Sequence, residues 1–448
     1  MLRRLSFSFL LVSVFLLLSV GPNINLRMNY QSIYAQGNAV NNTSNVPSRV
    51  MEIPGSLFAH NAGTPILKDL HLKADTVVSG LSLPTTIAFV GNNDILVLEK
   101  AKGTVERILN GKVLSKPLLK VNVESQVERG MLGIAVAHNR NGPTYVFLYF
   151  TENTNSSTSN PDGSASVANR VYRYEYVGGR LINPKIILDL PATPGPRHNA
   201  GSIVVGPDNN LYVPIGDVDG HSSQAQNVPD GGPADGTGGI LRTTQDGKPV
   251  GNGILGTTSP VNKYYAYGIR NTFGLGFDPL TKNLWDTENG AGSNDEINLV
   301  KPGFNSGWVQ VQGKAPPEFD YSQLFTFGGK GKYHDPEFSW HDTTGPTKIL
   351  FLNSSKLGKN YENDVFVSDI HHGRIFHFKM NANRTSLALQ GPLVDRVADT
   401  DNETNGLIFG SNFGGISDME VGPDGYLYIV SLGRGSIYKI VPNLEIIR

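Results

Sequence analysis

One histidine and one aspartate stand at the two ends of a strand–turn–strand pattern, His198 and Asp217. Residues 202–205 are mostly β-branched, residues 206–210 are turn formers, and residues 211–215 form a second short apolar run, which together predict a β-hairpin. Because a hairpin doubles back, His198 and Asp217 are expected to be neighbours. A carboxylate beside a histidine orients the ring and stabilises its charged form, as in a general base. The alternative is an ordinary surface hydrogen bond.

A second candidate is the pair Arg270 and Asn271, which directly precedes an apolar segment at residues 272–277. If that segment is an inner strand, both side chains face the mouth of a central site. Arg270 would clamp an anionic or carbonyl oxygen, and Asn271 would donate a hydrogen bond alongside it. The alternative is an arginine paired with an acid of an adjacent loop.

The loop that begins at Glu288 reads E-N-G-A-G-S-N-D-E-I-N. Its glycines allow backbone carbonyls to turn inward, and its many oxygen ligands suit Ca²⁺, although the spacing is not that of an EF-hand. The alternative is an acidic turn in which Asp295 and Glu296 accept hydrogen bonds from loop amides.

Three further candidates have weaker support. Glu128 precedes an apolar strand, His371 follows one, and Trp340 precedes a loop where it would lie at the mouth of a substrate site. A histidine at such an edge is more often a packing or surface residue than a ligand.

The elements that must position these residues belong to a unit that recurs along the chain. Each copy has an apolar strand, a turn rich in Gly, Asn or Asp, a strand of large apolar residues, and a further turn and strand; the turns begin near residues 91, 139, 206, 278, 361 and 422. Three to four strands per unit with a repeat of about 50–80 residues is typical of propeller blades. We therefore predict an all-β, six-bladed β-propeller over residues 60–448. A two-sheet sandwich with a second domain does not explain the sixfold return.

Composition supports this class. The 448 residues include 51 Gly and 27 Pro with only 17% charged residues, which is typical of a turn-rich β protein. The net charge of -1 provides no field that would attract nucleic acid or an anionic membrane. Because the chain has no cysteine, disulfides, zinc–cysteine sites and thiol chemistry are excluded. Polar, glycine-rich segments at 152–169, 218–238 and 310–335 are expected to be loops on one propeller face.

The N-terminus predicts export. Arg3 and Arg4 precede an apolar run at residues 5–20, which indicates a signal peptide over residues 1–35, followed by a flexible leader over 36–59. An uncleaved membrane anchor is the alternative. We expect the folded part to be secreted or otherwise extracytoplasmic. Glycosylation is expected at some of the Asn-x-Ser/Thr positions, which are Asn41, Asn42, Asn155, Asn353, Asn383 and Asn402.

Taken together, these segments resemble the quinoprotein glucose/sorbosone dehydrogenase family, soluble sugar dehydrogenases that use pyrroloquinoline quinone (PQQ). The similarity is clearest in the stretches 129–135, 198–217, 267–271 and 288–308. It implies a six-bladed propeller that binds PQQ and Ca²⁺, oxidises an aldose sugar at the anomeric carbon, and passes electrons to an external acceptor.

The resemblance also implies roles for individual residues. His198 matches the general base that takes the proton of the anomeric hydroxyl, and Asp217 matches the carboxylate that orients it. Arg270 and Asn271 match contacts to the quinone oxygens. Glu128 matches a polar cofactor contact that is usually Gln. Gly290 and Ala291, the latter usually Pro, match the backbone carbonyls that hold Ca²⁺.

The chain departs from the family at the cations that meet the three carboxylates of PQQ. His371 stands where the family has a lysine, and Gly415 and Ser417 stand where it has arginines. Arg374 or Arg434 would have to compensate. Two other functions therefore stay open. One is a non-catalytic propeller that binds a glycan or surface partner through loops 218–238 and 310–335. The other is a Ca²⁺-dependent hydrolase or lactonase, which needs side-chain carboxylates at the axis.

Overall fold

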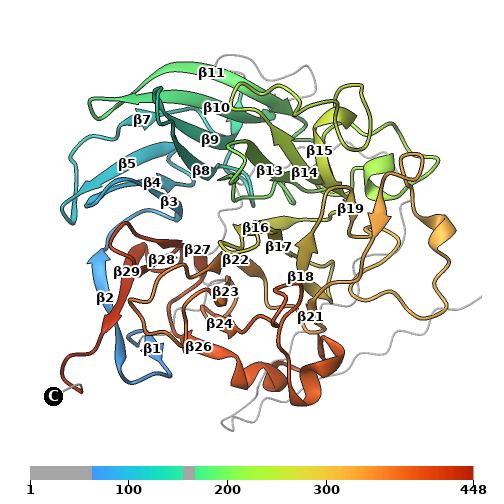
Figure 1. Cartoon of the computed structure of the whole chain (residues 1–448). Coiled ribbons are helices and arrows are strands. Elements are labelled where there is room, and N and C mark those ends of the chain that lie inside the picture. The colour runs from blue at the N-terminus through green and yellow to red at the C-terminus, as the bar shows by residue number, and fades with distance from the viewer. Residues whose placement is uncertain (1–62, 155–166, 447–448) are drawn as a thin grey trace, which may run out of the picture. The chain divides into compact units, whose positions relative to one another are not determined.

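In the computed structural model of the chain, residues 63–154 and 167–446 are described, so the predicted signal peptide (1–35) and leader (36–59) lie outside the described part. That part folds into six small β-sheets around a common centre (Figure 1). The predicted all-β, six-bladed propeller is confirmed. The described residues form strands and short 3-10 helices and no α-helix, and none forms a helix with the length and hydropathy needed to span a bilayer.

The blades follow one another along the chain, and the first strand of each lies nearest the centre. Blade one contains β3 (Pro84–Gly91), β4 (Asp94–Glu99), β5 (Thr104–Leu109), β6 (Lys112–Val113) and β7 (Leu119–Lys120). Blade two contains β8 (Met131–His138), β9 (Thr144–Asn153), β10 (Val167–Val177) and β11 (Arg180–Leu190). Blade three contains β12 (Val204–Val205), β13 (Leu211–Ile215), β14 (Gly239–Thr243), β15 (Tyr264–Tyr267), β19 (Phe304–Asn305) and β20 (Lys332–Tyr333).

The second half of the ring repeats the arrangement. Blade four contains β16 (Thr272–Phe277), β17 (Leu284–Glu288), β18 (Asp295–Val300), β21 (Phe338–Trp340) and β25 (Val397–Ala398). Blade five contains β22 (Pro346–Phe351), β23 (Val365–Asp369), β24 (Ile375–Phe378), β26 (Ile408–Ser411) and β1 (Ile66–Leu67). Blade six contains β27 (Ile416–Val421), β28 (Leu427–Ser431), β29 (Ser436–Pro442) and β2 (Leu72–Val78). The 3-10 helices are η2 (Gln224–Gln226), η3 (Val261–Lys263), η4 (Tyr321–Gln323), η5 (Gly391–Asp395) and η6 (Asp401–Gly406).

The ring is closed by pairing the two ends of the folded chain. Strand β2, from the N-terminal end, is the outer strand of blade six, antiparallel to the C-terminal strand β29, with Asp75 opposite Lys439 and Thr76 opposite Tyr438 (Figure 1). Strand β1 likewise completes blade five by pairing with β26. Blade six therefore contains strands from both ends of the folded chain. The ring cannot open at this point without breaking the hydrogen bonds between β2 and β29.

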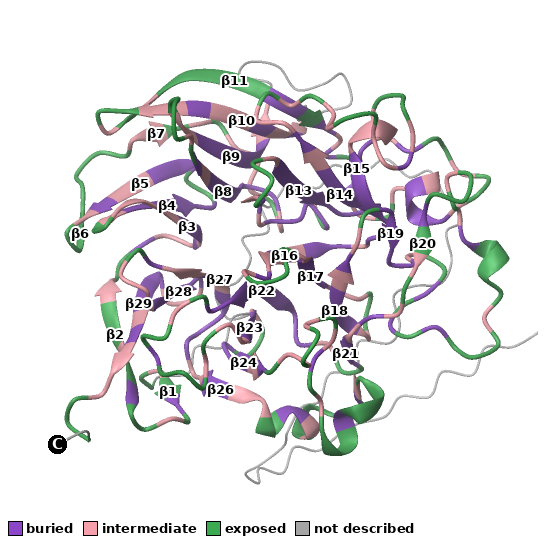
Figure 2. Ribbon diagram, viewed as in Figure 1, coloured by how far each residue is buried: buried purple, intermediate pink, exposed green. Residues whose placement is uncertain are grey.

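The core lies between the blades. Six clusters of buried apolar side chains in the described part fill the six gaps between neighbouring blades. Strand β4 shows the principle, since Leu96 and Leu98 pack toward blade two and Ile95 and Val97 toward blade six. Successive side chains of a strand point to opposite faces, so a strand between two blades must be apolar on both. Each such residue stabilises the ring by about 1.5–3 kcal/mol. The second strands β13, β17, β23 and β28 are buried along their whole length, whereas the outer strand β11 is mostly exposed (Figure 2).

Candidate active site

His198 and Asp217 form a buried hydrogen-bonded pair, as the hairpin pattern predicts. Strands β12 and β13 pair with Val204 opposite Tyr212, which brings the two residues together. The His198 Nδ1 and Asp217 Oδ1 atoms are 2.5 Å apart, and the two residues are 7% and 2% exposed. A carboxylate on Nδ1 fixes the proton there and leaves Nε2 as the basic nitrogen.

The backbone around the pair is held in an unusual conformation. His198 has φ 59° and Ala200 has φ 64°, both in the left-handed region that costs a non-glycine residue roughly 1–3 kcal/mol. Gly216 makes the close approach possible, because a Cβ there would lie 2.3 Å from the Arg270 carbonyl oxygen and 2.6 Å from the His198 carbonyl oxygen. The Asp217 N–H donates to the Arg270 carbonyl over 2.9 Å, which joins blade three to blade four.

The charge of Asp217 is stabilised by its neighbours. Burial acts to raise the pKa of Asp217, but the hydrogen bond and charge of His198, the Gly220 N–H and the charge of Arg270 together lower the pKa below its ordinary value. The second carboxylate oxygen accepts from the Trp308 indole Nε1 over 2.9 Å. Asp217 is therefore an ionised acceptor at neutral pH. Trp308 is not among the residues predicted from sequence, where its only signal is that of an aromatic residue in a glycine-containing loop.

Arg270 lies on the Trp308 ring, with its guanidinium carbon 5.5 Å from the ring centroid. Its Nη1 donates to the carbonyl oxygens of Asn289 and Gly290 over 2.9 Å and 2.7 Å. The side-chain hydrogen bonds of Arg270 in the described part go to these backbone carbonyls and not to a carboxylate, so it is not the arginine of a surface ion pair. These contacts place a fixed positive charge next to the His198 pair.

Glu128 connects several of these groups. Its Oε2 accepts from the His198 backbone N–H over 2.6 Å and from Asn271 Nδ2 over 3.1 Å. The Oδ1 atom of Asn271 is buried and has no hydrogen-bond partner in the described part of the chain. One polar atom at this point therefore lacks the partner that buried polar groups normally have.

The Gly290 loop is tied down by Asp295, and the predicted acidic turn is thus present. The two Asp295 oxygens accept from the backbone N–H groups of Gly290, Thr344 and Gly345 over 2.7–2.8 Å. Ala291, at the tip, is exposed. The turn fixes the direction of the Gly290 carbonyl. The loop is therefore compatible both with the acidic-turn interpretation and with the Ca²⁺-site interpretation.

Behind the loop lies a group of buried carboxyls on strands β17 and β18. Ser306 Oγ lies 2.6 Å from Glu288 Oε2 and 3.3 Å from Glu296 Oε2, and Gly313 N–H donates to Glu296. Burial, reinforced by a neighbouring carboxyl, raises the pKa of Glu288 and of Glu296 to about 8. Burial likewise raises the pKa of Asp286 to about 7. Near neutral pH this group therefore retains protons and supports the loop as a largely neutral hydrogen-bonded cluster.

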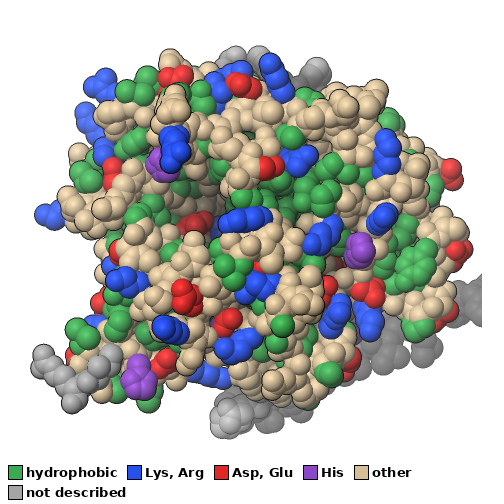
Figure 3. Space-filling view, in the orientation of Figure 1, with side chains coloured by type: hydrophobic (Ala, Val, Ile, Leu, Met, Phe, Trp, Pro, Cys, Tyr) green, Lys and Arg blue, Asp and Glu red, His purple; other side chains and the backbone are tan. Residues whose placement is uncertain are grey.

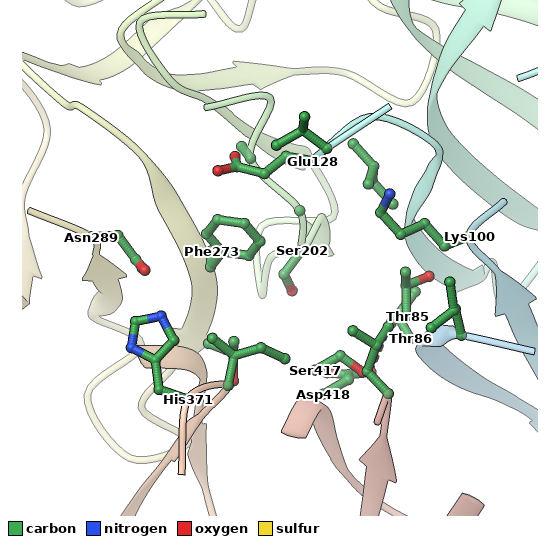
Figure 4. Close-up of a pocket in the computed structure, with 18 residues that line it drawn as sticks. Thr85, Thr86, Lys100, Glu128, Ser202, Phe273, Asn289, His371, Ser417 and Asp418 are labelled. Carbon is green, nitrogen blue, oxygen red and sulfur yellow. Dashed lines mark hydrogen bonds between the residues drawn. The ribbon is translucent and has the colours of Figure 1, made fainter. Parts of the chain in front are cut away.

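A cavity of about 290 Å³ lies at the centre of the ring (Figure 4). Inner-strand residues and their flanks form its walls, among them Thr85, Thr86, Ser202, Phe273, Thr347, Ser417 and Asp418. Lys100, Glu128, Asn289 and His371 reach it from the connecting segments. His198 and Arg270 do not line the cavity themselves. They are joined to its lining by Glu128 and by the Asn289 carbonyl.

The positions where the family resemblance implies cations differ in their surroundings. His371 lines the cavity and is exposed. Ser417 also lines it, and its hydroxyl donates to the Pro84 carbonyl over 2.9 Å. Gly415 contributes no side chain. Blade six therefore supplies no positive charge at these two positions.

The arginines expected to compensate are engaged elsewhere. Arg374 forms ion pairs with Asp369 and Asp401 at 2.8 Å and 2.6 Å, so its charge is already neutralised. Arg434 donates to Asn412 Oδ1 over 3.2 Å. Neither residue lines the cavity. Lys100 does line the cavity, and it is not among the residues predicted from sequence.

The prediction that Trp340 lies at the mouth of a substrate site is wrong. Trp340 is 1% exposed and packs in the core between blades four and five, with its ring centroid 4.8 Å from that of Phe338 and 5.3 Å from that of Phe376. Strand β21 lies between β18 and β25 in its sheet and holds the indole there. The tryptophan that contacts the His198–Asp217 pair is Trp308.

Trp340→Ala is expected to lower the free energy of unfolding by about 3–5 kcal/mol, because it leaves a large cavity between two blades. Chemical denaturation with Trp340→Phe as the milder comparison measures this. If the alanine variant kept wild-type stability but lost affinity for a substrate, the core position would be contradicted.

Comparisons with known proteins agree with this geometry. The model of the family described as Glucose / Sorbosone dehydrogenase matches residues 81–439. A putative oxidoreductase (glucose dehydrogenase) from Thermus thermophilus has 26% identity and a TM-score of 0.64, covering 83% of this chain and 100% of that structure. The PQQ-bound form of an aldose sugar dehydrogenase from Streptomyces coelicolor has 24% identity and a TM-score of 0.59, covering 85% and 100%. Quinoprotein glucose dehydrogenase B of Acinetobacter calcoaceticus is 29% identical over 292 residues, 59% of each chain.

Proposed function

Because this chain belongs to the glucose/sorbosone dehydrogenase family, we propose that it oxidises aldose sugars at the anomeric carbon with PQQ as cofactor and Ca²⁺ as its metal ion. The observation that carries the proposal is the buried His198–Asp217 pair, joined through Glu128 to a central cavity. A base with one nitrogen fixed by a carboxylate is what removal of a hydroxyl proton requires.

The residues around the cavity fit PQQ. The cavity is close to the lower end of the volumes typical of ligand sites, and it contains a buried ammonium at Lys100 for a cofactor that carries three carboxylates. The buried Asn271 Oδ1 lacks a partner, as an atom that awaits a ligand would. Arg270, Asn271, Glu128 and Lys100 would hold the cofactor.

The Gly290 loop fits Ca²⁺ in the direction of its carbonyl. The Gly290 oxygen already points at a positive group, the Arg270 guanidinium, 2.7 Å away. A carbonyl turned toward a cation has the orientation that a Ca²⁺ ligand needs. In the proposed holoenzyme the carbonyls of Gly290 and Ala291 would hold Ca²⁺, and Arg270 would contact the cofactor.

The roles of the chain's own residues follow from these contacts. Asp217 accepts a hydrogen bond from the Nδ1–H of His198, so Nε2 is free to take the proton of the anomeric hydroxyl. The ionised Asp217 then stabilises the imidazolium, and Trp308 holds Asp217 in place. When bound, PQQ supplies the two-electron acceptor for the hydride of the anomeric carbon, and Ca²⁺ polarises its carbonyl.

The alternative functions have less support. A hydrolase that holds Ca²⁺ with side chains would need converging carboxylates, and the described residues contain no group of three or more His, Asp or Glu arranged to hold a metal ion. Asp418 lines the cavity, but Lys348 and Thr86 occupy its oxygens at 3.2 Å and 2.7 Å. A glycan-binding propeller without catalysis would leave the His198–Asp217 pair unexplained.

We further propose that the enzyme works outside the cytoplasm and passes electrons to an external acceptor. The apolar N-terminal run and the sequons support this location. Three sequon asparagines in the described part, Asn353, Asn383 and Asn402, are exposed, so a glycan could be attached there. Lys and Arg are interspersed with Asp and Glu on the face seen in Figure 3, which favours a neutral sugar over a polyanionic substrate.

Purified protein is expected to bind PQQ saturably in the presence of Ca²⁺ and then to reduce a dye when an aldose is added. Chelation of Ca²⁺ should abolish dye reduction, and added Ca²⁺ should restore it, because the metal ion polarises the reacting carbonyl. Absorbance titration and a panel of aldoses measure both effects. If PQQ does not bind at any Ca²⁺ concentration, the proposed function is wrong.

A further inference from the structure

The loops that connect the second and third strands of the blades place one residue after another around the centre. Asp217 follows β13, Asn289 follows β17 and His371 follows β23. Lys100 follows β4 in the same way and lines the central cavity opposite Asn289 and His371 (Figure 4). Lys100 thus occupies, in blade one, the position that provides site residues in blades three, four and five.

The backbone of Lys100 is fixed on both sides. Its N–H donates to the Leu83 carbonyl and its carbonyl accepts from the Met131 N–H, each over 3.0 Å. Gly130 leaves room for the side chain, because a Cβ at position 130 would lie 2.8 Å from the Lys100 Cγ. The ammonium therefore enters the cavity from a rigid base.

The Lys100 ammonium lacks a counter-ion. Lys100 is 9% exposed, and its Nζ donates to the Ser125 backbone carbonyl over 3.0 Å. Within the described ranges no carboxylate lies within 4.0 Å of Nζ, and the preceding Glu99 pairs with Lys102 instead, at 2.7 Å. An ammonium has three N–H donors, so two remain for a ligand.

Burying such a charge without a partner is costly, and proteins rarely retain it unless something pairs with it. The other charged or titratable groups that line the cavity are Glu128, Asp418 and His371, and Glu124 acts on Lys100 from outside the lining. Asp418 is paired with Lys348, and Glu128 accepts from His198 and Asn271. Among the described residues, Glu128 and Glu124 act on Lys100 only at a distance, and none of them forms an ion pair with its ammonium.

We propose that Lys100 is a carboxylate-binding residue of the central cavity and that, given the proposed function, it holds a carboxylate of PQQ from blade one. Its positive charge replaces part of the charge that is missing in blades five and six, where His371, Gly415 and Ser417 stand in place of the family's cations. The recognised chemistry is an aromatic polycarboxylate, and the interaction is an ammonium–carboxylate ion pair with charge-assisted hydrogen bonds.

The affinity of Lys100 for a carboxylate is expected to depend on pH. Burial lowers the pKa of Lys100 to about 8, against the opposing charges of Glu128 and Glu124. The ammonium binds an anion and the neutral amine does not, so affinity is present below this pKa and falls as pH rises through it. An arginine at this position keeps its charge throughout that range.

The test compares Lys100→Gln, which retains a donor for the Ser125 carbonyl but no charge, with Lys100→Arg and with Lys102→Gln. Lys102 is exposed and outside the cavity, so its variant controls for the loss of one lysine. Calorimetric titration uses two probes, PQQ and benzene-1,3,5-tricarboxylate, which lacks the quinone. Thermal unfolding of each variant is recorded in parallel.

Lys100→Gln is expected to bind PQQ about 10- to 100-fold more weakly at pH 7, with Lys102→Gln unchanged. Between pH 7 and pH 9 the wild type should lose affinity and Lys100→Arg should not. If the folded glutamine variant binds both probes within about twofold of wild type, or if wild type binds neither, the proposal is overturned. If wild type binds the tricarboxylate through Lys100 but not PQQ, the anion site stands and the proposed sugar oxidation fails.

Discussion

Replacing His198 with alanine is expected to lower kcat for sugar oxidation by about 10²–10⁴-fold, the usual contribution of a positioned general base. The imidazole is buried, and its Nδ1 is held 2.5 Å from the Asp217 carboxylate, so no other described side chain can take over its position. The affinity for PQQ should change little, because the residues proposed to hold the cofactor are Arg270, Asn271, Glu128 and Lys100 and not the His198 side chain.

Steady-state kinetics on the cofactor-loaded variant measure the rate, and a PQQ titration measures the affinity. His138→Ala is the matched control, since His138 is exposed at the far end of β8 and its ring forms a hydrogen bond with Thr144, outside the site. A rate loss of less than about tenfold in His198→Ala, with wild-type cofactor binding, would remove His198 from the role of base.

Asp217→Asn is expected to reduce kcat by about 10²-fold or more, although the two side chains have nearly the same shape. One carboxylate oxygen accepts from His198 Nδ1 and the other from Trp308 Nε1. An amide has a single acceptor oxygen. If that oxygen faces Trp308, the amide N–H₂ faces Nδ1 and shifts the ring proton to Nε2, which can then no longer accept the substrate proton. If the amide oxygen faces His198, the amide N–H₂ and the Trp308 N–H, which are both donors, face each other.

The measurement separates kcat from KM and records the pH profile of kcat, which a merely structural role would not alter. Asp230→Asn, in an exposed part of the loop after η2, is the matched control. Asp217→Asn should keep PQQ affinity and shift the profile. Unchanged kcat at every pH, in a variant that still folds, would show that Asp217 does not orient the base.

Much of this fold could be predicted from local pattern, because the blade repeats a short-range signal. The turn residues and apolar runs of each unit identify its strands, and the hairpin from His198 to Asp217 brings those residues together as expected. The repeated pattern does not predict that the first and last parts of the folded chain pair with each other. Strand β2 joins β29 across most of the chain, and no local periodicity encodes that register.

The errors at the site have physical causes. Trp340 sits before a loop in sequence, but its strand is covered on both sides within blade four, so the indole is buried. Trp308 is recognisable only by its contact with Asp217, which depends on backbone hydrogen bonds that hold the segment after β19 beside Gly268 and Gln226. Lys100 was missed because a single lysine after a strand has no local signal that separates it from a surface lysine. Its equivalence to Asp217 and His371 becomes visible once the blades are superposed by topology.

The most direct test of the account is a single-turnover experiment on the PQQ- and Ca²⁺-loaded protein, in which an aldose is mixed in and the cofactor absorbance is followed. The account predicts reduction that saturates with sugar, is slower with sugar deuterated at the anomeric carbon, and is at least about 10²-fold slower in His198→Ala. PQQ bound at full occupancy with no sugar-dependent change in absorbance, across a panel of aldoses, would contradict it.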